Sequence, residues 1–69
     1  MASKIYEDFD EFYKAIWDDL VKNFIVPSEY DDMRKFMEEE KENARRDFNA
    51  GRNTHADVLS KAYAYSLMF

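Results

Sequence analysis

A single proline and a single glycine, Pro27 and Gly51, interrupt this 69-residue chain. A fold made of strands needs frequent reverse turns, and proline and glycine are especially common in reverse turns. So few turn-forming residues favour a few long helices over many short strands. The sequence therefore predicts an all-α fold in which Pro27 and Gly51 separate three helical segments. The chain length allows one domain, residues 1–69.

The core of such a short domain has to come from aromatic packing or from self-association, because there is no cysteine to form a disulfide. The chain carries six Phe, five Tyr and one Trp. Its hydrophobic content of 46% excludes the composition of a disordered chain. We therefore expect a dense aromatic core.

The first segment is typical of an amphipathic helix, from about residue 7 to residue 24. Its apolar residues recur at steps of three and four: Ile5, Phe9, Phe12, Tyr13, Ile16, Trp17, Leu20, Val21 and Phe24. They fill about half of the helix circumference, which predicts contact with more than one neighbour. Pro27 ends the segment because it cannot continue a helix and restricts Val26 to an extended conformation.

The second segment predicts the longest helix, residues 29–50, with Ser28 as its N-cap and Gly51 directly after its end. Its apolar stripe is narrow and contains no apolar residue between Met37 and Ala44. The stretch EEEKE, residues 38–42, fills that interval.

Helical spacing divides the EEEKE stretch. Glu38, Glu39 and Glu42 point away from the apolar stripe, whereas Glu40 falls on the side expected to be buried. Three ion pairs at helical spacing are expected to support this helix: Asp31–Lys35, Glu42–Arg45 and Glu42–Arg46.

The third segment predicts a shorter helix, residues 55–67, with Thr54 as its N-cap and Asp57 completing a capping box. Apolar residues lie nearly all round it, and two helices can hardly cover such a surface. We expect a small three-helix bundle, with the first two helices antiparallel and the third packed across them. The uncovered apolar surface makes a helical dimer an alternative to a monomer.

The net charge of −5 is unevenly distributed. Six acids face three lysines in residues 1–26, and eight acids face five basic residues in residues 27–51. Binding to nucleic acid or to an anionic membrane needs a basic face, so both are disfavoured as direct partners. The start of the chain carries no apolar leader and no stretch is long enough to span a bilayer, which predicts a cytoplasmic protein.

Catalytic and cofactor motifs are not recognisable in the sequence. His55 is the only histidine, and no cysteine or second histidine accompanies it. The carboxylates lack the alternating oxygen ligands and glycine turn of a calcium loop. We therefore expect no enzyme activity, no cofactor and no metal.

A basic corner remains as a weaker alternative. Arg45, Arg46, Arg52 and His55 lie around the predicted turn between the second and third helices. The turn FNAGRNTH contains glycine, as helix-turn-helix motifs often do, and would allow a small DNA-binding regulator. The start of the third helix, however, offers few side chains that could read bases.

Two functional hypotheses are favoured over this one. In the first, the chain is a small acidic effector that binds a protein with a basic surface, and it blocks a nucleic-acid-binding site as phage or mobile-element inhibitors do. The acidic surface would comprise Asp8, Glu11, Asp18, Asp19, Glu38, Glu39 and Glu42. The competing interpretation of these residues is an ordinary solvated face.

In the second hypothesis the chain is an oligomeric helical adaptor, and a homodimer is the expected assembly. Its hydrophobic interface would comprise Trp17, Tyr63, Tyr65 and Phe69.

Overall fold

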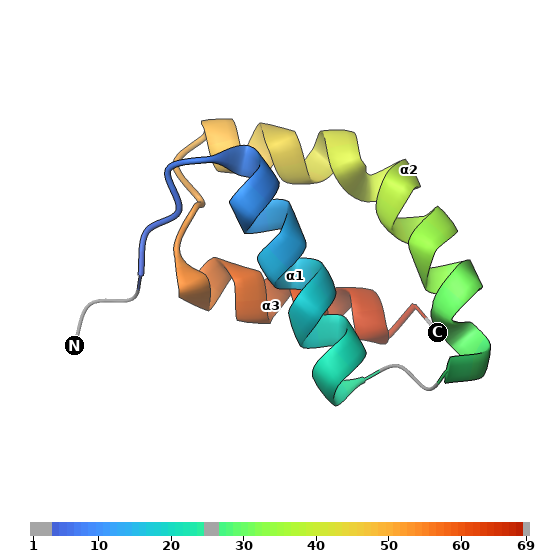
Figure 1. The fold of residues 1–69 in the computed structure, drawn as a ribbon. Helices are drawn as coiled ribbons and strands as arrows, with labels where there is room; N and C mark the ends of the chain where they lie inside the picture. Colours follow the sequence, from blue (N-terminus) through green and yellow to red (C-terminus); the bar gives the residue numbers. More distant parts are fainter. Residues whose placement is uncertain (1–3, 25–26, 69) are drawn as a thin grey trace.

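The computed structural model describes residues 4–24 and 27–68, and these residues form three packed helices and no sheet (Figure 1). The helices are α1 (Phe9–Asn23), α2 (Tyr30–Asn49) and α3 (His55–Ser66), and a 3-10 turn, η1 (Pro27–Glu29), precedes α2. The prediction of an all-α three-helix fold is confirmed.

The helix ends follow local capping chemistry. α1 begins at Phe9 because the side chain of Asp8 accepts a hydrogen bond from the backbone N–H of Asp10. The prediction that Ser28 caps the second helix is wrong, since Ser28 lies within η1 and the N-cap position is held by Glu29 without a side-chain hydrogen bond. The extended conformation expected for Val26 lies outside the described residues.

The turn between α2 and α3 agrees with the sequence. Gly51 adopts a φ of 95°, the left-handed conformation that ends many helices and that residues with a Cβ adopt at a cost. Thr54 and Asp57 form the predicted capping box: the Thr54 hydroxyl accepts from the Asp57 N–H, and the Asp57 carboxylate accepts from the Thr54 N–H at 3.0 Å.

α1 is the central helix of the bundle. It packs against both other helices and most extensively against α3, which it crosses in Figure 1, while α2 curves around the outside. The largest side chains that are less than 2% exposed come from all three helices: Phe12, Ile16, Leu20, Met33 and Val58. α2 and α3 approach each other through long side chains, such as the rings of Phe36 and Tyr65 at 5.2 Å. The third helix thus lies mainly against the first.

A clasp, formed by Lys4–Tyr6 and Asn53–His55, ties the N-terminal arm to the turn before α3. The Tyr6 N–H donates to the Asn53 carbonyl at 2.7 Å, and the His55 N–H donates to the Lys4 carbonyl at 2.7 Å. The Asn53 side-chain amide donates to the Tyr6 carbonyl at 3.0 Å, and the Tyr6 hydroxyl lies 3.0 Å from Nδ1 of His55. His55 therefore has a structural role in the clasp.

Candidate functional site

The outer side of α2 carries a row of carboxylates. Its exposed acids, which we call the α2 carboxylate row, are Asp31, Asp32, Glu38, Glu39 and Glu42. Their spacing places them on the side of the helix opposite the buried residues Met33, Met37 and Ala44. Lys35 and Arg46 share that side of the helix and Arg45 borders it, so the five carboxylates outnumber the cations near them.

The row is largely free of internal ion pairs. Among the described residues, Glu42 is its one member with a cation within 4.0 Å, Arg45 at 3.8 Å. The expected pairs Asp31–Lys35 and Glu42–Arg46 do not form within that distance. The carboxylates are therefore available to an external cation.

Three of the five cations of α2 lie over aromatic rings. We call the line of Arg34, Lys41 and Arg45 along the boundary with α1 the cation seam. Each lies over a ring: Arg34 is 5.4 Å from the centre of Tyr30, Lys41 is 5.3 Å from Tyr13 and Arg45 is 4.4 Å from Phe9. These distances are those of cation–π contacts.

Sequence reasoning missed the cation seam, although a signal was present. Positions 34, 41 and 45 recur on one side of a helix, and the aromatic residues at positions 9, 13 and 17 recur on one side of the first helix. Both patterns could be read locally, as could the four-residue step from Tyr30 to Arg34. The contacts of Lys41 with Tyr13 and of Arg45 with Phe9, however, depend on how the two helices pack.

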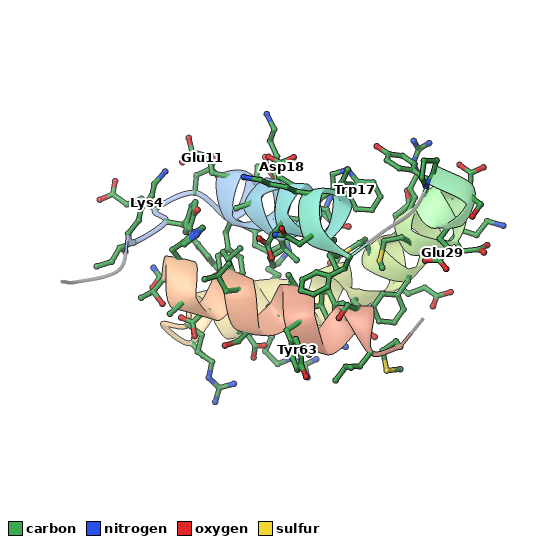
Figure 2. The ribbon with its side chains drawn as sticks, turned by 90° about the horizontal axis from the view of Figure 1, so that it is seen from below. Lys4, Glu11, Trp17, Asp18, Glu29 and Tyr63 are labelled. Carbon is green, nitrogen blue, oxygen red and sulfur yellow. The ribbon has the colours of Figure 1, made fainter. Side chains whose placement is uncertain are left out.

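The four predicted site acids in α1 and at its N-cap do not form a comparable row. Asp8 caps the helix, and Asp19 is half-buried and accepts a hydrogen bond from the Asn23 amide at 2.8 Å. Glu11 and Asp18 are exposed and project from the side of α1 away from α3 (Figure 2). Lys14 and Lys22 lie on the same side of α1 as Glu11 and Asp18, so the net charge of that side is close to zero.

Glu40 lies toward the core side of α2, as its position in the helix predicts. It is half-buried and accepts a hydrogen bond from the Asn43 amide at 2.9 Å. Its charge adds to the effect of burial in raising the pKa of Tyr65 to about 12. Glu40 is therefore part of the packing between α2 and α3 and not of the carboxylate row.

An ion-pair cluster joins the end of α2 to α3. Asp47 binds the ammonium group of Lys61, and its other oxygen lies 3.1 Å from the guanidinium of Arg52. The hydrogen bond from Lys61 is the main cause that lowers the pKa of Asp47, the two positive charges add to it, and burial opposes it. This cluster fixes α3 relative to α2.

The residues of the predicted hydrophobic interface are placed in different environments. Tyr65 is 8% exposed and lies in the core. Trp17 is half-buried and packs edge-on against Tyr30, with ring centres 4.9 Å apart. Tyr63 is 58% exposed, and Phe69 lies outside the described residues. Among the three of these residues that the structure describes, only Tyr63 is exposed.

Exposed apolar side chains lie along α3 and at the end of α1. We define the α3 apolar patch as Val21, Phe24, Leu59, Tyr63, Leu67 and Met68, each at least 38% exposed. Leu59, Tyr63 and Leu67 follow one another at four-residue steps along α3. Phe24 connects α1 to this line, since its ring lies 6.4 Å from that of Tyr63.

A groove of about 280 Å³ follows the boundary between α1 and α2. Its lining residues are Tyr13, Trp17, Tyr30, Arg34, Met37, Glu38 and Lys41. Figure 2 shows Trp17 between α1 and the beginning of α2. The groove thus combines an aromatic wall with two residues of the cation seam.

The basic corner considered for DNA binding is largely engaged within the protein. Arg45 lies over Phe9 and near Glu42, and Arg52 pairs with Asp47. Within residues 4–24 and 27–68, no cluster of acids and histidine has the composition of a metal site, and no helix is long and apolar enough to cross a membrane.

Comparison of the chain with protein-family models, with curated proteins and with solved structures finds no match.

Proposed function

We propose that this chain is a small, non-enzymatic protein-binding effector whose α2 carboxylate row binds a basic surface of a partner protein. The observation that carries the proposal is the separation of charge on α2: the row is exposed and mostly unpaired, while Arg34, Lys41 and Arg45 lie over aromatic rings. A partner does not have to break internal ion pairs before it can bind most of these carboxylates.

The kind of basic surface follows from the spacing of the charges. Glu38 and Glu39 lie four and three residues before Glu42, which places these carboxylates about 5–6 Å from Glu42. A nucleic-acid strand likewise presents a line of closely spaced negative charges. A surface that binds a phosphate backbone therefore fits the row. We propose that the partner is a nucleic-acid-binding enzyme and that the chain blocks its binding surface, in the manner of inhibitors from phages and mobile elements.

The first experiment uses the protein as an affinity bait on a lysate of the native host, with mass spectrometry as the readout. A triple variant, Glu38→Lys, Glu39→Lys and Glu42→Lys, serves as the second bait. We expect the wild-type chain to capture a nucleic-acid-binding protein, the triple variant to lose it, and duplex DNA to compete for it. Capture should weaken steeply with salt because it depends on charge.

A matched control separates the row from net charge. Reversing Glu7, Asp10 and Asp18 to Lys changes the total charge by the same amount but leaves α2 intact. All three side chains are exposed, and none has an ion pair among the described residues. Equal loss of capture in the two triple variants, with helical circular dichroism retained in both, would show that the row has no special role. Capture that is insensitive to salt would also overturn the proposal.

A second candidate function is supported by the α3 apolar patch. Side chains such as Tyr63 and Leu67, 58% and 69% exposed, lie in the part of the chain with the lowest density of charge, which favours self-association into a homodimer. Light scattering over a concentration series tests this. We expect a dimer that Leu67→Glu converts to a monomer, and a wild-type chain that is monomeric at every concentration would exclude it.

A further inference from the structure

The groove between α1 and α2 has a chemistry that the proposed function does not use. Tyr13 and Trp17 contribute from α1, and Tyr30 contributes from the beginning of α2. The Trp17 and Tyr30 rings meet edge to face, so part of the aromatic wall is fixed by packing. Flat aromatic surfaces of this kind suit a planar apolar group.

Two cations stand at the border of the groove. Arg34 and Lys41 line it, and neither has an ion pair or a side-chain hydrogen bond to a carboxylate among the described residues. Their positions seven residues apart place them on the same side of α2, each above a ring of the wall. Seven residues span about 10 Å along a helix, so a negative group near the rings would lie between two cations that are already held in place.

Two further groups adjust the charge of the groove. Among the described residues that line it, Glu38 alone is acidic against Arg34 and Lys41, so this lining carries an excess of positive charge. Burial, and then the charge of Glu38, raise the pKa of Tyr13. Tyr13 also lines the groove, and its hydroxyl can donate a hydrogen bond to an anionic ligand.

We propose that this groove binds an aromatic carboxylate, with the ring against the aromatic wall and the carboxylate between Arg34 and Lys41. The ligand could be a free small molecule or an aromatic side chain beside a carboxylate in a peptide, since both present the same chemistry. This site is separate from the surface in the proposed function, although Glu38 borders both.

Trp17 is the only tryptophan in the chain, so its fluorescence reports directly on the groove. The probe is phenylacetate, and the controls are phenylacetamide, which keeps the ring, and acetate, which keeps the charge. We expect saturable binding of phenylacetate with a Kd of about 1 mM, as for a ligand of this size. Phenylacetamide should bind about threefold more weakly, because it lacks the charge, and acetate should give no saturable change.

Three variants locate the carboxylate. Arg34→Gln and Lys41→Gln should each weaken phenylacetate binding about threefold. Lys35→Gln removes the same charge from the outer side of α2 and should leave binding unchanged. Thermal unfolding shows whether each variant is folded, and because Arg34 is exposed, its variant remains informative if Lys41→Gln destabilises the protein.

Several results would overturn the proposal. These are equal affinity for phenylacetate and phenylacetamide, an equal effect of Lys35→Gln and Arg34→Gln, and no saturation by any aromatic carboxylate below about 50 mM. A second probe, N-acetyl-Asp-Phe-amide, distinguishes the sources: tighter binding than phenylacetate indicates a peptide segment, and weaker binding indicates a free small molecule.

One substitution separates this inference from the proposed function. Glu38→Gln should tighten phenylacetate binding about threefold, because it removes a like charge from the groove. The same change should weaken capture of a basic partner by the carboxylate row. If the row has no role, the effect on phenylacetate remains, and if the groove has no role, the effect on capture remains.

Discussion

The buried hydroxyl of Tyr65 provides the sharpest test of the core. The side chain is 8% exposed, and its oxygen has no hydrogen-bond partner among the described residues. A buried polar group without a partner costs about 1–3 kcal/mol relative to its hydrated state. Tyr65→Phe removes that group and retains the ring contact with Phe36, so we expect the free energy of unfolding to rise by about 1 kcal/mol at pH 7.

The effect should grow at alkaline pH. Burial, with the charge of Glu40, raises the pKa of Tyr65 from 10.0 to about 12. Below pH 10 the hydroxyl is protonated in both the folded and the unfolded chain, and between pH 10 and 12 it ionises in the unfolded chain first. Ionisation then favours unfolding, by about 1.4 kcal/mol at pH 11. Phenylalanine cannot ionise, so at pH 11 the advantage of the variant should reach about 2–3 kcal/mol.

Urea unfolding followed by circular dichroism measures both values. At pH 7, an increase of about 1 kcal/mol corresponds to a rise in Tm of about 4–8 °C in a domain this small. Tyr63→Phe is the matched control: it removes a hydroxyl from an exposed position two residues away and should change the free energy of unfolding by less than about 0.5 kcal/mol. A Tyr65→Phe variant that is less stable than the wild type at pH 7 would refute the reasoning, since it would mean that the hydroxyl makes a favourable hydrogen bond.

Three further substitutions test other parts of the fold by the same unfolding assay. Phe12→Ala should cost about 4 kcal/mol, most of the stability of a domain this size, because the ring is fully buried. Thr54→Ala should cost about 1 kcal/mol, because it removes half of the capping box of α3. Asp47→Asn should cost about 1 kcal/mol at pH 7. Because the pKa of Asp47 is lowered, the stability from its ionised form is present above pH 3.8, so the difference between Asp47→Asn and the wild type should shrink as the pH falls below about 4.

The features that could be predicted from the sequence are local ones. Pro27 and Gly51 mark the helix boundaries because each restricts or permits particular backbone angles wherever it occurs. The capping box of Thr54 and Asp57 involves residues three positions apart. The spacing of Phe12 and its neighbours identified the buried side of α1, since that side is set by the helix period.

The features that could not be predicted depend on distant residues. In the clasp, Tyr6 and Asn53 are 47 residues apart, and neither belongs to a recognisable motif. The third helix was apolar nearly all round, so its period could not show that Tyr65 faces the core and Tyr63 faces solvent.

The cation seam shows how tertiary packing changes a local expectation. Arg45 was expected to serve mainly as a partner of Glu42, and it does lie 3.8 Å away, but it also lies 4.4 Å from the ring of Phe9 on another helix. Lys41 likewise lies over Tyr13 of α1. Spacing along one helix cannot reveal these rings. The sequence pattern therefore predicted more neutralisation of the carboxylate row than the structure shows.

The cation seam also predicts that a substitution that changes no carboxylate will affect binding. Arg34 lies over the ring of Tyr30, and it is also within helical reach of Asp31 and Glu38, three residues before and four residues after it. Tyr30→Leu removes the ring and leaves Arg34 free to pair with the row. We therefore expect the affinity for a basic peptide such as octalysine to fall about twofold at low salt, with the difference disappearing at high salt.

Tyr30→Phe is the matched control, because it keeps a ring beneath Arg34 and should bind octalysine as the wild type does. Isothermal titration calorimetry at two salt concentrations gives the affinities, and circular dichroism verifies that both variants are folded. Equal affinities of Tyr30→Leu and Tyr30→Phe would mean that the ring does not hold Arg34 away from the row. The charge separation on α2 would then be a consequence of helical spacing alone, because the cations would remain on their side of the helix without the rings.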